Sequence, residues 1–190
     1  MLSRDAIESF DHLFEHAIHD NSVSADDVLT QMTRQQERRI AADGESRRLV
    51  VLNISSYVFR VVALFDFATD EVTRAHLAKI LRCPRSQMEG QGLEDAYAEL
   101  VNMICGAVHR GLSSAFSHGG MSTPLMLENT CERYVSLLNP SWTQSYAVEI
   151  NQTVRFNLMA CVCVAKGLTL DFALDRSLAQ EESAGELELF

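Results

Sequence analysis

The sequence contains no long hydrophobic run. Its longest unbroken apolar stretch covers eight residues, from Leu158 to Ala165, whereas a helix that crosses a bilayer needs roughly 20. Residues 1–8 carry acidic side chains, and they lack the basic segment and apolar core of a secretory signal. We therefore expect a soluble, cytoplasmic protein that does not bind membranes.

Basic residues are scarce. The chain holds 16 Lys and Arg against 26 Asp and Glu, for a formal net charge of -10. The acidic excess lies in residues 1–45 and 171–190, on either side of a nearly neutral body. Without a basic stripe, nucleic acid and anionic membranes are unsuitable partners. The acidic flanks could steer a basic partner, but we interpret them as solubilising surfaces.

The cysteine pattern suits neither disulfides nor a metal. Five cysteines without a secretory signal indicate a reducing compartment. Cys161 and Cys163 stand at strand spacing, and no second Cys or His pair has the spacing of a zinc site. We interpret both as small core residues and predict no metal site. Cys105 and Cys131 lack a histidine that the sequence can place beside them, which argues against a cysteine nucleophile.

Glycine-rich catalytic loops are also missing. Gly106, Gly111, Gly119 and Gly120 match neither of the common phosphate-binding spacings, and no Gly-x-Ser-x-Gly segment occurs. The sequence therefore gives no support for nucleotide hydrolysis.

The composition is that of one globular domain. The chain has 190 residues, of which 47% are hydrophobic, and it shows neither an internal repeat nor a linker that would split its body. We predict a helical N-terminal extension over residues 1–45, a domain over residues 46–175 and an acidic tail over residues 176–190.

Hydrophobic periodicity predicts two helices before residue 45. Residues 3–19 repeat apolar side chains at helical spacing behind Ser3, a suitable cap. A second helix is expected over residues 25–42, between Ser24 as its cap and Gly44 as its end, although its apolar stripe is thin. The first helix carries three histidines that we interpret as surface residues, because nothing nearby completes a ligand set: His12, His16 and His19.

The pattern changes from Arg47 onward. Residues 49–54 and 57–67 predict two strands joined at Ser55 and Ser56. Asp70 is expected to cap a short helix that ends before Pro84. A long helix over residues 93–116 precedes a short extended run at 125–127 and an irregular stretch through Pro140. Three strand-like segments then follow, at residues 146–150, 154–164 and 168–172.

The long helix carries the most informative pattern. Its apolar stripe should face a core. Opposite that stripe, the spacing places five residues on one solvent-facing strip: Asp95, Glu99, Asn102, Gly106 and His109. Glu99 and Asn102 are one turn apart, where a carboxylate can pair with a lysine and an amide can both donate to and accept from a water. Gly106 leaves room for another surface to approach.

The segment Glu99-Leu-Val-Asn102-Met-Ile-Cys-Gly106 resembles the Glu-x-x-Asn signature of the CheC, CheX and FliY phosphatases, which dephosphorylate the response regulator CheY in bacterial chemotaxis. The order of predicted elements is similar over residues 47–174, including Ser122-Thr123-Pro124 at the entry to a strand, while the first 45 residues lie outside the resemblance. A single copy of the motif is typical of CheX, whereas CheC usually has two.

Two departures from the family bear on the choice of partner more than on the fold. Ala107 and Val108 stand where the family commonly has an asparagine after the motif glycine. Glu128 and Asn129 stand near the place of a glycine common in the family.

The resemblance implies an α+β fold, a CheC/CheX-like sheet of about six strands packed against two or three long helices, with the N-terminal helical extension added. It implies in-line hydrolysis of an aspartyl phosphate on a CheY-like receiver domain, with Asn102 orienting the water and Glu99 anchoring the receiver's lysine. The remaining residues of the predicted partner contact are Asp95, Met103, Gly106 and His109.

The same resemblance implies a homodimer with no cofactor of its own, because the receiver carries the Mg²⁺. The alternative is a catalytically inactive adaptor of the same fold that binds a receiver, flagellar or signalling protein. Loss of phosphate from a phosphorylated receiver would distinguish the two functions.

Overall fold

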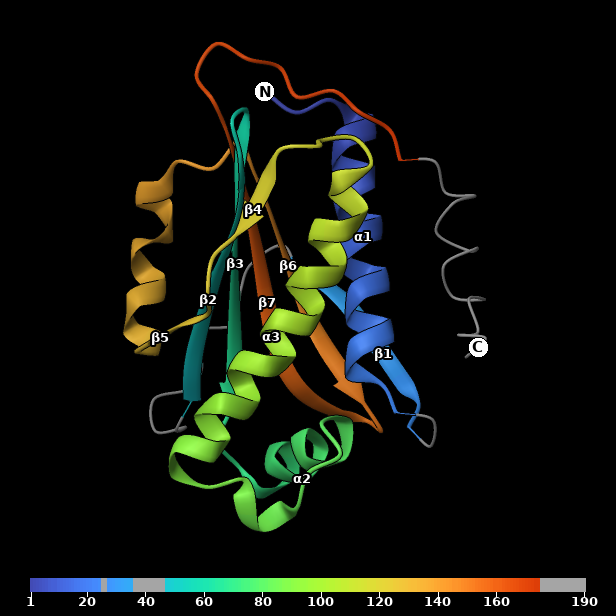
Figure 1. The fold of residues 1–190 in the computed structure, drawn as a ribbon, viewed down its shortest axis with the longest axis vertical. Coiled ribbons are helices and arrows are strands. Elements are labelled where there is room, and N and C mark those ends of the chain that lie inside the picture. Colours follow the sequence, from blue (N-terminus) through green and yellow to red (C-terminus); the bar gives the residue numbers. More distant parts are fainter. Residues whose placement is uncertain (25–26, 36–46, 175–190) are drawn as a thin grey trace, which may run out of the picture.

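A computed structural model of the chain describes residues 1–24, 27–35 and 47–174. These residues form a seven-stranded sheet in the order β1-β6-β7-β3-β2-β4, with β5 also paired to β2, and the paired strands run antiparallel (Figure 1). The strands are β1 (Leu29–Gln35), β2 (Arg47–Ser56), β3 (Phe59–Ala68), β4 (Gly119–Met121), β5 (Leu125–Leu127), β6 (Trp142–Ile150) and β7 (Thr153–Val164).

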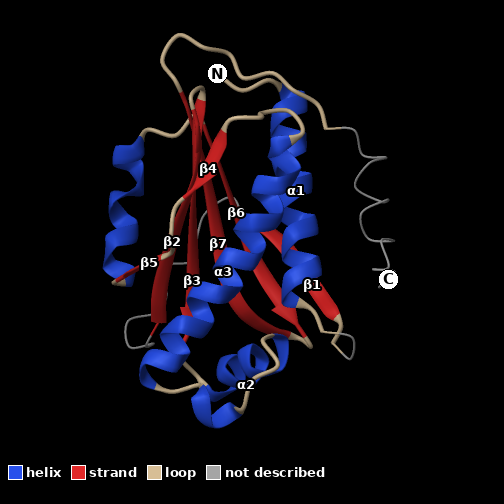
Figure 2. Cartoon of the chain, viewed as in Figure 1, coloured by secondary structure: helices blue, strands red, loops and turns tan. Residues whose placement is uncertain are grey.

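Helices lie on both faces of this sheet (Figure 2). One face carries α1 (Arg4–Ser22) and α3 (Gly90–Ser113), with α2 (Glu71–Ile80) and the short η1 (Arg85–Gln87) at one end. The other face carries η2 (Asn129–Leu138), in a stretch that the sequence predicted to be irregular. The predicted α+β fold is confirmed. Within the described residues, no helix has the length and apolar character needed to span a membrane.

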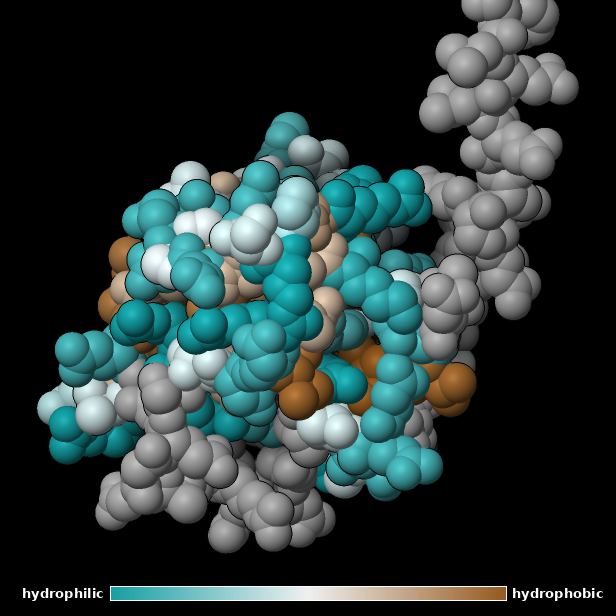
Figure 3. Space-filling view, turned by 90° about the horizontal axis from the view of Figure 1, so that it is seen from below, coloured by the Kyte–Doolittle hydropathy of each residue, from teal (hydrophilic) through white to brown (hydrophobic). Residues whose placement is uncertain are grey.

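Two apolar clusters correspond to the two faces of the sheet. The larger one joins the sheet to α1, α2 and α3 and includes Phe10, Phe65 and Ile104. The smaller one includes Val51 and Leu64 and lies beneath η2, whose Val135 packs against it. Seen from the α2 end, the described surface is mainly hydrophilic and hydrophobic residues show as separate spots (Figure 3).

The predicted hairpin of β2 and β3 is confirmed. Strand residues alternate between the two clusters, as period-two side chains should. The turn falls at residues 57–58, so Ser55 and Ser56 belong to the end of β2 instead of the joint between the strands. The Ser56 hydroxyl accepts from the backbone N–H groups of Val58 and Phe59, at 3.2 and 3.4 Å, which holds this turn.

The first helix is confirmed and belongs to the main core. Ser3 Oγ accepts from the Ala6 N–H at 3.1 Å, as a cap does, and Phe10 and Phe14 are fully buried. His16 and His19 are exposed, as predicted, and each places its Nδ1 about 3 Å from a carboxylate oxygen of Asp20. The predicted N-terminal extension thus contributes a helix to the same core as the domain.

The predicted helix over residues 25–42 is wrong. Residues 29–35 form β1, which pairs with β6, and the rest of that segment falls partly outside the described residues. The open edge of β6 supplies backbone partners that a weakly amphipathic segment takes up in place of its own helical bonds. Arg34 of β1 also bonds Glu15 of α1 at 2.7 Å, which ties the edge strand to the helix layer.

The third strand-like segment after residue 140 is also not a strand. The predicted segments at 146–150 and 154–164 lie in β6 and β7, but residues 168–172 make one isolated parallel bridge, between Leu170 and Leu2. Their apolar side chains instead cover the end of the core. Leu170 is buried, and the centroids of the Phe172 and Phe10 rings lie 5.3 Å apart. The predicted acidic tail lies outside the described residues.

Candidate active site on helix α3

Helix α3 spans Gly90–Ser113, three residues earlier at each end than the sequence predicted. It begins after η1, where Gly90 has a φ of +51° that favours glycine. Its predicted apolar stripe is confirmed, because the residues facing the sheet are buried: Leu93, Ala96, Tyr97, Leu100, Val101, Ile104, Cys105, Val108 and Leu112. The opposite strip is consequently held toward solvent.

The outer strip of α3 contains the predicted catalytic pair. Asp95 and Glu99 are exposed, and Asn102 and Met103 are half-buried. Asp95 accepts a hydrogen bond from the amide of Gln91 at 2.8 Å. Within the described residues, neither Glu99 nor Asn102 has a side-chain hydrogen bond or ion pair. Their polar groups are therefore available to a partner.

Gly106 lies one turn beyond Asn102 on the same strip. A Cβ built on Gly106 would meet only the Nη1 atom of Arg110, at an ordinary contact distance of 3.6 Å. Gly111 on the same helix is different, because its Cβ would stand 2.3 Å from Cδ2 of Leu13 on α1. Packing within the chain explains Gly111 and does not explain Gly106, which leaves bare helix backbone beside Asn102.

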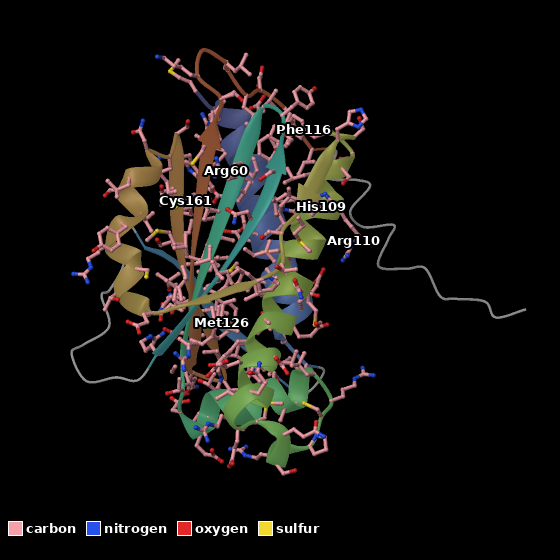
Figure 4. All side chains as sticks on the ribbon, turned by 60° about the vertical axis from the view of Figure 1, so that its left-hand side comes forward. Arg60, His109, Arg110, Phe116, Met126 and Cys161 are labelled. Atoms are coloured by element: carbon pink, nitrogen blue, oxygen red, sulfur yellow. The ribbon has the colours of Figure 1, made fainter. Side chains whose placement is uncertain are left out.

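His109 faces the chain's own sheet edge. It is half-buried, and its Nε2 atom is buried without a hydrogen-bond partner among the described residues. A Cβ on Gly119 of β4 would lie 3.2 Å from that atom, and Figure 4 shows the residue between α3 and the sheet edge. Of the predicted contact residues, His109 is the one that lies against β4, so the solvent-facing position predicted for its ring is wrong.

The structure gives no support for cysteine chemistry. Burial raises the pKa of the Cys105 thiol, which disfavours a thiolate. Cys131 lies on η2, across the sheet from α3, and Cys161 is buried beneath it. All five cysteines are free thiols. Among the described residues, no group of three or more His, Cys, Asp or Glu side chains is arranged to hold a metal ion.

Sequence reasoning missed Arg110. This exposed residue follows Gly106 by four positions and so extends the strip by one turn. Helical spacing from Asn102 and Gly106 was the signal that could have identified it.

Solved structures resemble this chain, although its sequence matches no family model and no curated protein. CheX of Borrelia burgdorferi, in a CheX-CheY-BeF3-Mg²⁺ complex, aligns with a TM-score of 0.60 and 12% identity over 85% of this chain and 99% of that one. A CheC-like superfamily protein from Shewanella sp. PV-4 aligns at 0.51 and 11%, over 84% and 98% of the two chains. The chain has the fold of CheX and CheC-like proteins.

A third match shows how much of this chain the fold covers. A putative chemotaxis protein from Desulfovibrio vulgaris Hildenborough aligns at a TM-score of 0.51 and 14% identity, over 84% of this chain and 99% of that one. Residues 47–190 make up about three quarters of the sequence, so matches of 84 to 85% must include part of the first 46 residues. The CheX-like fold thus extends beyond residues 47–174, in agreement with the packing of α1.

Proposed function

We propose that this chain is a CheX-like member of the CheC/CheX/FliY family that hydrolyses the aspartyl phosphate of a CheY-like receiver domain, in chemotaxis or a related two-component pathway. One observation carries the proposal. Glu99 and Asn102 stand one turn apart on the outer strip of α3, without side-chain partners among the described residues. They do so in a fold shared with a CheX that was solved with CheY, BeF3 and Mg²⁺.

Asn102 is the residue proposed to orient the attacking water. Its amide can accept one hydrogen bond from the water and donate another to the phosphoryl group. The side chain is half-buried within a 24-residue helix, which limits the conformations open to it. Holding water in line with the phosphorus converts an encounter of two molecules into a reaction within one complex.

Glu99 is the residue proposed to anchor the receiver's lysine. Two carboxylates lie on this part of the strip, and Asp95 is already bonded to Gln91. Glu99 is exposed and can turn its carboxylate toward a docked lysine without breaking a bond to a described residue. Such a charge-assisted contact fixes the position of the receiver relative to Asn102.

We infer that the Mg²⁺ arrives with the receiver. A divalent cation near the phosphoryl oxygens neutralises the charge that develops during the transfer. Helix α3 then supplies the oriented water and the anchor, while Met103 and Gly106 provide surface beside them. A homodimer, as the family resemblance implies, stays a prediction.

The decisive experiment follows the loss of radioactive phosphate from a phosphorylated receiver in the presence of Mg²⁺. We expect the wild type to accelerate this loss and Asn102→Ala to reduce the acceleration on the order of 100-fold, because the water is no longer positioned. Glu99→Ala should weaken the reaction at limiting receiver concentration. The control is Ser113→Ala, since that hydroxyl bonds only the carbonyl of His109 among the described residues.

Two outcomes would contradict the proposed reaction. If Asn102→Ala acts at the wild-type rate, water orientation by this residue is wrong. If the wild type binds the receiver and does not shorten the lifetime of its phosphate, the chain is an adaptor of the same fold.

A further inference from the structure

Arg110 covers the bare backbone at Gly106. It is exposed on the sixth turn of α3, and its Nη1 atom lies 3.6 Å from the position that a Cβ on Gly106 would occupy. The side chain therefore runs back toward the N-terminal end of the helix, as helical side chains tend to do. Figure 4 shows Arg110 directed away from the sheet.

The charge of Arg110 is not used by the described part of the fold. Arg34, Arg47, Arg48 and Arg85 each form an ion pair with a carboxylate, whereas Arg110 has neither an ion pair nor a side-chain hydrogen bond with a described residue. A positive charge near the C-terminal end of α3 interacts favourably with the helix dipole, and at an exposed site this stabilises the helix only modestly. That effect depends on positive charge alone and does not require the guanidinium to lie over Gly106.

The sign of the charge therefore changes along the outer strip. Glu99 lies about 4.5 Å along the helix axis before Asn102, at a rise of about 1.5 Å per residue. The guanidinium of Arg110 reaches the level of Gly106, about 6 Å beyond Asn102 on the other side. A bound partner would therefore meet a carboxylate on one side of Asn102 and a cation on the other.

We propose that Arg110 is a specificity-determining residue that binds an anionic group of the receiver, either a phosphoryl oxygen or a carboxylate next to it. This inference rests on the proposed function, because Asn102 defines where the phosphoryl group lies. The chain carries a net charge of -10, so an anionic group of a partner needs a local cation at the contact. A guanidinium has the planar donor geometry that recognises phosphate and carboxylate groups with paired hydrogen bonds.

The test measures the affinity of the full chain for a receiver loaded with beryllofluoride and Mg²⁺, and for the same receiver without beryllofluoride. Arg110→Gln should weaken binding of the loaded receiver about 10-fold, because a charge-assisted contact is lost. Arg110→Glu should weaken it more, and Arg110→Lys should restore only part of the affinity. The matched control is Arg133→Gln, which removes the same charge from η2 on the opposite face of the sheet.

The two receiver states identify the anion. A loss of affinity seen only with beryllofluoride places the guanidinium on the phosphoryl group, and an equal loss in both states places it on a receiver carboxylate. In the dephosphorylation assay, KM should rise while kcat at saturating receiver stays near that of the wild type, since Asn102 and Glu99 are intact.

Wild-type affinity in Arg110→Gln overturns the inference, and so does an equal loss of affinity in Arg110→Gln and Arg133→Gln, which would assign the effect to net charge alone. A lower melting temperature with unchanged affinity would instead assign Arg110 to helix stability and overturn it as well. A wild-type chain that binds the receiver without dephosphorylating it would refute the proposed reaction, and the Arg110 variants would still test this contact.

Discussion

The two faces of α3 follow different rules. On the inner face, burial against the sheet and α1 accounts for every residue from Leu93 to Leu112 that the stripe contains. On the outer face, Glu99, Asn102 and Gly106 have no contact in the described structure that requires their identity. The buried residues of the inner face determine where the helix lies on the sheet. Residues that folding leaves unexplained mark the surface on which function should be sought.

The largest expected difference between the faces is in stability. Ile104 is fully buried in the main core, so Ile104→Ala should lower the free energy of unfolding by about 2 to 5 kcal/mol. Glu99→Ala, on the exposed face, should change it by less than about 0.5 kcal/mol. Urea denaturation of both variants measures this difference. An unchanged stability of Ile104→Ala would show that the two faces are assigned the wrong way round.

A buried histidine on α2 makes the stability of the fold depend on pH, as an exposed histidine does not. His76 is 6% exposed, and burial, with the nearby Arg155 cation, lowers its pKa from 6.5 to about 4. The unfolded chain therefore binds a proton between pH 6.5 and 4 that the folded chain does not. This contribution to stability is fully present above pH 6.5 and is lost as the pH falls toward 4.

Between pH 7 and pH 5, the contribution of His76 to the free energy of unfolding should fall by about 2 kcal/mol. His76→Gln removes the titrating group, so its free energy of unfolding should fall less over this interval than that of the wild type. Urea denaturation at both pH values provides the measurement. His118→Gln, at an exposed position, is the control for replacing a histidine with glutamine. Equal pH dependence in His76→Gln and the wild type would contradict the buried neutral state of this histidine.

Elements determined by local signals could be predicted from the sequence. The caps at Ser3 and Asp70 are short-range hydrogen bonds, and both form as expected, to Ala6 and Thr73. The stripe of α3 and the β2–β3 hairpin follow directly from their periods of hydrophobicity.

Elements that depend on distant partners could not be predicted. β1 is a strand because β6 offers it an edge, and residues 168–172 close the core beside Phe10 instead of joining the sheet. Both contacts join segments more than 100 residues apart, which local periodicity does not report. The outer strip was predicted by spacing, whereas the packing of His109 against β4 and the direction of the Arg110 side chain over Gly106 depend on side-chain conformations that spacing does not specify.

The smallest effects come from the two glycines of α3, and they should have opposite signs. Replacing a helical glycine with alanine stabilises a helix by up to about 1 kcal/mol where space allows. Gly106→Ala has that space and should raise the free energy of unfolding, because its Cβ would make an ordinary 3.6 Å contact. Gly111→Ala should lower it by about 1 kcal/mol, because displacement of Leu13 outweighs the helical gain.

Gly106 therefore separates stability from function, since a larger side chain should obstruct a docked receiver while the fold tolerates it. Gly106→Trp should remain folded by its melting curve and lose affinity for the receiver loaded with beryllofluoride and Mg²⁺. Calorimetric titration of Gly106→Ala and Gly106→Trp beside the wild type measures both properties on the same samples. Full complex formation by a folded Gly106→Trp would show that the receiver does not bind at this strip. A destabilised Gly106→Ala would show that the fold itself requires glycine at this position.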